Sequence, residues 1–168
     1  MDFYILDLIK KIFECPFMDF IMPKITSLGN GGFIWILTAV VLLFFKKYRK
    51  GGIAMLISLA IGAILGSFIL KPLIARPRPF HAMGELPLLI KIPTDFSFPS
   101  GHTMSSFSAA FILNHINKKF GYFAIPLAIL IAFSRLYLYV HFPSDVLAGA
   151  VLGILISYLT VKILKINR

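Results

Sequence analysis

Most of the side chains that could do chemistry lie in three short stretches of an otherwise apolar chain. The stretches are KPLIARPRPF (residues 71–80), FPSGH (residues 98–102) and SRLYLYVHFPSD (residues 134–145). They contain a lysine and two arginines, Lys71, Arg78 and Arg135, that could meet at one point. Arginine presents a planar fork that matches phosphoryl oxygens, and lysine adds a compact positive charge. These three cations predict a binding site for a phosphate group.

The FPSGH stretch has the pattern of a helix start that binds an anion. Ser100 is a residue type that caps helices, and a smooth apolar segment follows it. Free backbone N–H groups and the positive end of the helix dipole favour a negative group at such a position. Gly101 has no side chain, so the backbone can approach an anion closely. We expect Ser100 and Gly101 to contribute to the same phosphate site.

Two histidines and an aspartate accompany the cations. His102 follows the predicted helix start, and His141 precedes Asp145 by four residues. A histidine and an aspartate at this spacing can hydrogen-bond, which fixes the imidazole tautomer and stabilises its cation. Two imidazoles beside a phosphate predict phosphoryl transfer in two steps, with one as nucleophile and the other as proton donor to the leaving oxygen. The alternative is that both are hydrogen-bonded structural histidines.

The elements that hold these residues are predicted to be membrane-spanning helices. The 168-residue chain is 58% hydrophobic and only 14% charged, and its mean hydropathy of +0.87 is too high for an ordinary soluble domain. A helix needs roughly 20 residues to cross a bilayer. Five apolar segments approach this length, namely residues 31–45, 53–70, 103–116, 121–140 and 145–161. We expect one all-α domain over residues 1–168, with a transmembrane helix bundle over residues 31–161.

Residues 1–22 are expected to form a separate amphipathic helix. Residues 3–22 carry five charged side chains among bulky apolar ones, which is too many for a span that faces lipid. A helix that lies in the membrane interface fits this composition. The alternative is a first span packed against the bundle.

The basic residues outside the three stretches indicate topology rather than nucleic-acid binding. The formal net charge is +10, and nine of the 17 basic residues lie in three clusters. The clusters are residues 46–50, then Lys118 with Lys119, then Lys162, Lys165 and Arg168. With five spans, all three clusters fall on one side of a plasma membrane, which the positive-inside bias makes cytoplasmic. The three chemistry-bearing stretches then lie at the extracytoplasmic side, and no nucleic acid is expected as a partner.

Other polar and aromatic residues have plainer interpretations. Arg76 is expected to be a solvated loop charge, with a direct role in substrate binding as the alternative. His81 is assigned to the rim of the site, and His115 to the cytoplasmic membrane interface. Trp35 and Tyr137 are expected to face lipid or the interface, where such aromatic rings are enriched.

Together, the three stretches resemble the signature of the type 2 phosphatidic acid phosphatase family. Residues 71–79 match Lys-x6-Arg-Pro, residues 99–102 are Pro-Ser-Gly-His, and residues 134–145 match Ser-Arg-x5-His-x3-Asp. The motifs occur in the family's order over residues 71–145, and no motif position departs from the pattern. The resemblance implies an all-α core similar to that of this family and of the vanadium chloroperoxidases.

The resemblance also implies a role for each motif residue. Phosphate would be bound by Lys71, Arg78, Arg135, Ser100 and Gly101. His141 would attack phosphorus, Asp145 would orient it, and His102 would protonate the departing oxygen. The family uses no metal, and Glu85, Asp95 and Asp145 are few carboxylates for a two-metal centre. We therefore expect no metal and no cofactor.

A site at the outer headgroup level indicates a lipid phosphate as substrate, reached from the bilayer. Similarity to small bacterial members of the family favours hydrolysis of undecaprenyl diphosphate, with phosphatidylglycerol phosphate and phosphatidic acid as alternatives. Two rival classes are a vanadate-dependent haloperoxidase-like protein and a non-enzymatic lipid transporter. Haloperoxidases are soluble and larger, and a transporter would not need two histidines with an aspartate partner. A homodimer is left open.

Overall fold

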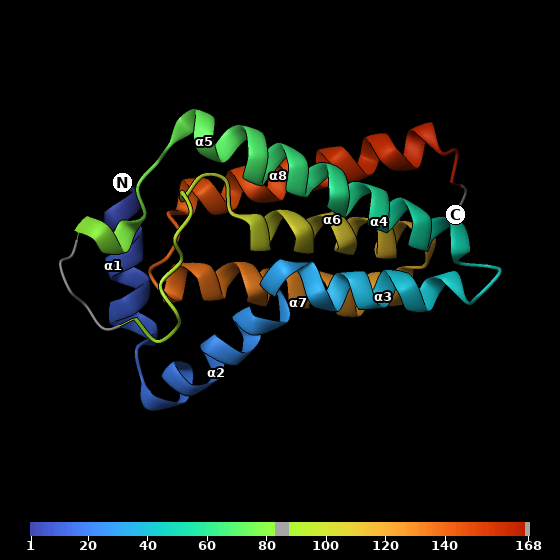
Figure 1. Ribbon diagram of the computed structural model, residues 1–168. Helices are drawn as coiled ribbons and strands as arrows, with labels where there is room; N and C mark the ends of the chain where they lie inside the picture. The colour runs from blue at the N-terminus through green and yellow to red at the C-terminus, as the bar shows by residue number, and fades with distance from the viewer. Residues whose placement is uncertain (83–87, 167–168) are drawn as a thin grey trace.

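The chain is described by a computed structural model over residues 1–82 and 88–166, and the regular elements of these residues are all helical. They are α1 (Asp2–Phe13), α2 (Pro16–Leu28), η1 (Asn30–Gly32), α3 (Phe33–Leu43), α4 (Arg49–Ala63), η2 (Ile64–Leu70), α5 (Lys71–Ile74), η3 (Pro79–Ala82), α6 (Gly101–Ile116), α7 (Lys118–Tyr137) and α8 (Pro143–Ile163). Figure 1 shows α3, α4, α6, α7 and α8 running along one axis, with α1 across one end. The predicted all-α bundle is confirmed. Glu85 and Arg168 lie outside the described residues.

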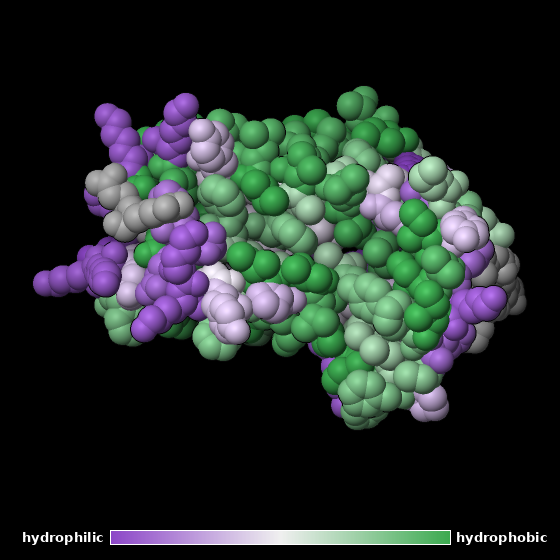
Figure 2. All heavy atoms as spheres, turned by 180° about the vertical axis from the view of Figure 1, so that it is seen from behind, coloured by the Kyte–Doolittle hydropathy of each residue, from purple (hydrophilic) through white to green (hydrophobic). Residues whose placement is uncertain are grey.

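The bundle has the dimensions and the surface of an integral membrane protein. Residues 49–82, α7 and α8 are long and apolar enough to cross a bilayer, and α2 with η1 and α3 forms a further candidate span bent by 43°. Helix α6 is shorter, with 16 residues, but it packs against α4, α7 and α8 within the bundle. Figure 2 shows a broad apolar surface between two hydrophilic ends of the molecule. We therefore describe the chain as a membrane protein.

The N-terminal segment differs from the single amphipathic helix expected over residues 1–22. The helix is broken at Cys15, whose backbone is extended (φ −159°, ψ 160°), and α2 begins at Pro16. Proline lacks the N–H that a continuing helix would need, so Pro16 is a favourable first residue of a new helix. Helix α1 is too short to span a membrane and covers the end of the bundle, whereas α2 leads into α3 (Figure 1).

Helices α6 and α8 pack closely because small residues of α8 face the α6 backbone. A Cβ at Gly149 would lie 2.6 Å from the carbonyl oxygen of Ser100, and a Cβ at Gly153 would collide with the carbonyl of Met104. Small residues at four-residue spacing permit this approach between membrane helices. The backbone N–H of Ser100 donates to the carbonyl oxygen of Asp145 at 3.1 Å. The first turns of α6 and α8, which carry two of the motifs, are therefore held together.

Trp35 and Tyr137 are buried, so the expectation that they face lipid or the interface is wrong. Trp35 is 2% exposed and donates from Nε1 to Ser106 Oγ at 2.9 Å. Tyr137 is 1% exposed and its hydroxyl donates to Asp19 Oδ1 at 2.6 Å. The polar atom of each ring finds a partner, and the rest of the ring fills space between helices.

The chain changes direction sharply after the second span, at the end of the molecule that carries α1. The π-helical segment η2 runs into the short helix α5, which begins with the buried residue Lys71. Helix α5 ends at Ile74, and the next residue, Ala75, caps it with a left-handed φ of 47°. The following residues, 76–79, then cross the end of the bundle, where the carbonyl oxygen of Arg76 accepts a hydrogen bond from the Ser97 N–H at 2.9 Å. This path places Arg76 and Arg78 against residues 140–145, where α7 connects to α8.

Candidate active site

The motif residues meet at the end of the bundle beneath α1. A cavity of about 600 Å³ opens there and contacts residues from every motif. Its lining includes Lys71, Arg78, Gly101, His102, Arg135 and His141, together with Asp95. Ser100 is fully buried behind this lining, at the N-terminus of α6. The structure therefore brings together all the predicted phosphate-binding residues and both predicted catalytic histidines.

Arg78 is buried (3% exposed) and is held mainly by backbone oxygens. Its Nη1 donates to the carbonyl oxygen of Val140 at 2.7 Å, and its Nε donates to that of Asp95 at 2.8 Å. Its Nη2 donates to Asp95 Oδ1 at 2.6 Å. These bonds place the guanidinium fork in the cavity wall with little freedom to rotate.

Lys71 and Arg135 complete the set of cations. Lys71 is 7% exposed, and its Nζ donates a hydrogen bond to Asp95 Oδ2. Arg135 is 3% exposed, and its Nη1 donates to Thr26 Oγ1 at 2.6 Å. Its Nε is buried and has no hydrogen-bond partner among the described residues. A buried N–H without a partner is costly, and Arg135 is one of the residues that line the cavity.

The start of α6 has the predicted geometry of an anion-binding helix end. Ser100 is the N-cap, with an extended backbone, and its Oγ accepts from the Thr103 N–H at 3.4 Å. A Cβ at Gly101 would meet no atom within 4 Å, so the cavity reaches the backbone at this residue. The unpaired N–H groups of the first turn can therefore contribute to binding an anion.

His141 lies in the connection between α7 and α8, with its ring almost completely buried. Its Nε2 lies 3.2 Å from Arg78 Nη1, and its Nδ1 lies 3.6 Å from Asp145 Oδ2. Arginine only donates hydrogen bonds, so Nε2 must accept and the proton must sit on Nδ1, on the side of Asp145. Burial lowers the pKa of His141, and the charge of Arg78 adds to this shift although the Asp145 carboxylate opposes it. His141 also lines the cavity, and its unprotonated Nε2 lies beside Arg78.

Asp145 receives more donors than the sequence alone indicates. Its Oδ2 accepts from the Phe142 N–H at 2.9 Å and from Ser97 Oγ. Its Oδ1 accepts from Arg76 Nη1 at 2.5 Å. The carboxylate is fully buried, so these bonds fix its orientation beside His141.

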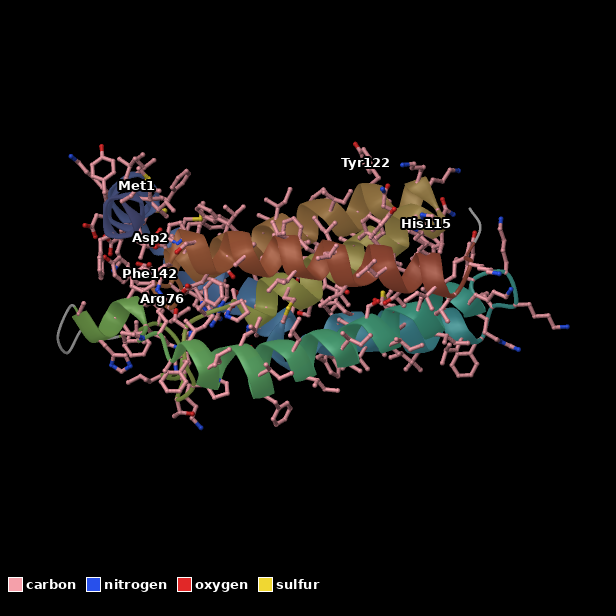
Figure 3. All side chains as sticks on the ribbon, turned by 90° about the horizontal axis from the view of Figure 1, so that it is seen from above. Met1, Asp2, Arg76, His115, Tyr122 and Phe142 are labelled. Atoms are coloured by element: carbon pink, nitrogen blue, oxygen red, sulfur yellow. The ribbon has the colours of Figure 1, made fainter. Side chains whose placement is uncertain are left out.

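Arg76 is therefore not a solvated loop charge, and that expectation is wrong. Besides Asp145, its guanidinium donates to Ser144 Oγ at 2.7 Å and to Asp2 Oδ2 at 2.8 Å. Its Cζ lies 4.0 Å from the centre of the Phe142 ring. Figure 3 shows Asp2, Arg76 and Phe142 close together at this end of the molecule. Arg76 links α1 to Asp145, the aspartate of the third motif. The sequence near Arg76 does not predict this contact.

His102 occupies the first turn of α6 and lines the cavity. Its Nε2 lies 2.9 Å from Asn30 Oδ1, which belongs to the kink between α2 and α3. This amide oxygen can accept the Nε2 proton and so orient the ring. Asn30 was missed by sequence reasoning because the two residues are separated by 72 positions.

The other two histidines, His81 and His115, do not line the cavity. His81 is exposed on η3, with its ring centre 4.3 Å from that of Phe80. His115 lies at the far end of α6, where its Nε2 contacts the carbonyl oxygen of Ile166 at 2.9 Å. Figure 3 shows His115 at the end of the bundle opposite Arg76.

A second cavity of about 460 Å³ joins the first and runs along the bundle. The two share Lys71, Asp95, Gly101 and His102. Beyond these residues the second cavity is lined mainly by small and apolar residues, including Ile36, Leu56, Leu59, Ala63 and Ile156. A polar chamber with three cations thus continues into an apolar passage between α3, α4 and α6.

The fold and this site define a helical membrane protein with a chamber lined by two histidines and three cations. Residues 51–168 match the family described as the PAP2 superfamily, and the chain belongs to this family. An undecaprenyl-diphosphatase of Sulfolobus acidocaldarius is 40% identical over 132 residues, which cover 78% of this chain and 64% of that protein. Phosphatidylglycerophosphatase B of Bacillus subtilis is 35% identical over 157 residues, which cover 86% of this chain and 74% of that protein. The chain thus spans just under two thirds of the Sulfolobus relative.

Solved structures place the fold in the same superfamily. The crystal structure of Aquifex aeolicus LpxE matches with a TM-score of 0.83 and 28% identity, over 96% of this chain and 94% of that one. A bacterial vanadium-dependent iodoperoxidase matches with a TM-score of 0.66 and 18% identity, over 84% of this chain and 43% of that one. The second likeness concerns the fold alone. The predicted fold class is confirmed.

Proposed function

We propose that this chain is a lipid phosphatase that hydrolyses a phosphate or diphosphate through a phosphohistidine on His141. The observation that carries the proposal is the unprotonated His141 Nε2, 3.2 Å from Arg78 Nη1, in a cavity that also holds Lys71 and Arg135. A phosphoryl group bound by these cations would lie against the nucleophilic nitrogen. Membership of the PAP2 superfamily supports the same reaction.

In the first step, His141 Nε2 attacks phosphorus while the bond to the lipid oxygen breaks. The three phosphoryl oxygens carry charge in the transition state and are held by Lys71, Arg78, Arg135 and the backbone N–H of Gly101. Ser100 contributes as the cap that fixes this helix end, because its own N–H donates to the carbonyl oxygen of Asp145. For this step His102 carries a proton on both ring nitrogens: Nε2–H stays on Asn30, and Nδ1 gives its proton to the departing oxygen. The Nδ1 proton of His141 faces Asp145, which stabilises the positive charge that develops on the ring.

In the second step, a water molecule attacks the phosphohistidine and the P–N bond breaks. His102, now neutral, takes a proton from that water at Nδ1, so its own state is restored. Phosphate leaves and His141 regains its lone pair. The three cations neutralise the phosphoryl charge in both steps, so neither step requires a metal ion.

A lipid substrate is supported by the apolar cavity that continues from the polar chamber. Its walls can bury part of a hydrocarbon tail while the phosphate occupies the chamber, which stabilises the complex by about 25 cal/mol per Å² of buried apolar area. We favour undecaprenyl diphosphate, for which the Sulfolobus relative is named. Phosphatidylglycerol phosphate is the second candidate, because the Bacillus relative is named for that lipid.

The site is proposed to face the extracytoplasmic side of the plasma membrane. The basic clusters of residues 46–50 and of Lys118 with Lys119 lie in the α3–α4 and α6–α7 turns. Figure 1 places both turns at the end of the bundle opposite α1. The positive-inside bias assigns that end to the cytoplasm. The cavity at the α1 end would then open outside.

The proposal is tested by phosphate release from the purified protein in detergent, with undecaprenyl diphosphate, phosphatidylglycerol phosphate and phosphatidic acid side by side. We expect the highest kcat/KM with undecaprenyl diphosphate and no loss in EDTA. His102→Asn should lower kcat by about 10²–10⁴-fold, whereas His115→Asn, on the same helix but at its other end, should not. Release that stops on chelation, or no release from any of the three lipids, would contradict the proposal.

A further inference from the structure

Asp95 lies between η3 and α6, where the two cavities meet. Its Oδ1 accepts a hydrogen bond from Arg78 Nη2 at 2.6 Å, and its Oδ2 accepts one from Lys71 Nζ. The carboxylate thus offers two oxygens to two of the three cations that would hold phosphoryl oxygens. An incoming phosphate needs the same N–H groups.

The Asp95 side chain is free to move away from Lys71 and Arg78 while the residues around it keep their positions. It is 53% exposed, whereas its partners Lys71 and Arg78 are almost fully buried. Arg78 does not depend on the carboxylate for its position, because it also donates to the backbone carbonyl oxygens of Asp95 and Val140 at 2.8 and 2.7 Å. Rotation of the Asp95 side chain would therefore free both cations while the backbone stays in place.

The carboxylate is charged at neutral pH and does not block the whole site. Burial raises the pKa of Asp95, but the hydrogen bonds and charges of Lys71 and Arg78 outweigh burial and lower that pKa to about 2. Arg135 lines the same cavity, and its Nη1 donates to Thr26 rather than to Asp95. Its guanidinium is therefore a phosphate contact that Asp95 leaves open.

We propose that Asp95 is an internal competitor of phosphate: its carboxylate takes the place of phosphoryl oxygens between Lys71 and Arg78 and is displaced when substrate binds. This inference rests on the proposed function, because it concerns the same site. The competition weakens the binding of every phosphate, including the orthophosphate product, and so speeds product release. A lipid substrate offsets the loss by burying its tail in the apolar cavity, which orthophosphate cannot do.

The test is the affinity of the full-length protein in detergent for inorganic phosphate, measured by calorimetry. Asparagine has the shape of aspartate without its charge, so Asp95→Asn should bind phosphate at least about tenfold more tightly. Asp95→Ala, which removes both oxygens, should do the same. Glu14→Gln is the matched control, because Glu14 pairs with Lys10 on the surface and its loss changes net charge equally. It should leave the affinity unchanged.

Three results would overturn the inference. The first is phosphate binding that is unchanged or weaker in the Asp95 variants, and the second is an equal gain in phosphate affinity in Glu14→Gln. The third is a failure of the Asp95 variants to fold, because a displaceable side chain is not needed for folding. Turnover of lipid phosphate on the same preparations separates this inference from the proposed function. Wild-type turnover with no tightening in the Asp95 variants would keep the phosphatase and reject the competitor.

Discussion

Arg76 Nη1 lies 2.5 Å from Asp145 Oδ1, although 69 positions separate the two residues. The contact joins the loop of the first motif to the aspartate that faces His141. The same guanidinium also bonds Asp2 of α1. Asp145 is therefore held by Arg76, a residue that does not line the cavity. Helix α1 takes part in this network through Asp2.

The first prediction concerns this positioning role. Arg76→Ala should lower kcat by about 10²-fold while KM changes little, because a displaced Asp145 misaligns the His141 ring without removing a phosphate contact. Steady-state kinetics on a lipid phosphate measure both parameters. Lys10→Ala, another cation removed near α1 but without contact to Asp145, should behave as wild type. A rise in KM at unchanged kcat would show that Arg76 binds substrate instead.

The second prediction concerns the contact of α6 with α8. Gly153→Ala should lower the free energy of unfolding by about 1–3 kcal/mol, because the new Cβ meets the Met104 carbonyl and the helices must separate. Thermal unfolding in detergent measures the change. Val151→Ala, at an exposed position of the same helix, is the control. A Gly153→Ala protein as stable as wild type would mean that the two helices are not this closely packed.

The third prediction follows from the lowered pKa of His141. Burial and the nearby charges of Arg78 and Arg135 favour the neutral ring in the folded protein, whereas the unfolded chain binds a proton near pH 6.5. The contribution of this group to stability is therefore complete above that pH and is lost as the pH falls below it. The decrease in Tm from about pH 8 to about pH 5 should be smaller in His141→Asn, whose side chain does not titrate. Equal decreases in the two proteins would be the contrary result.

The motif residues could be predicted from the sequence because their chemistry does not depend on the details of packing. Buried cations such as Arg135 need an anion wherever they lie, and the cap at Ser100 depends only on neighbouring residues. The all-α bundle also follows from segment length and hydropathy. These features are local, so a sequence without coordinates carries them.

The positioning residues could not be predicted in this way, because their partners are distant in the chain. Arg76 and Asn30 gain their contacts only when loops from separate spans meet at one end of the bundle. From the sequence, Asp95 is only one of a few carboxylates near the site. Its bridge between Lys71 and Arg78 depends on the path of the loop before α6, which the sequence does not predict. Hydropathy alone favours lipid or the interface for Trp35, because it does not reveal that Ser106 accepts the indole N–H inside the bundle.

The central claim is that His141 Nε2 becomes phosphorylated during turnover, and a direct measurement is the position of the phosphoryl group in the quenched enzyme. Wild-type protein would be mixed with a lipid carrying a radiolabelled phosphate and quenched rapidly in alkali, because a P–N bond is labile in acid. Peptide mapping should place the label on His141 in wild type and find none in His141→Asn, which should not turn over. Rapid turnover with no label on His141, or wild-type activity in His141→Asn, would contradict the account.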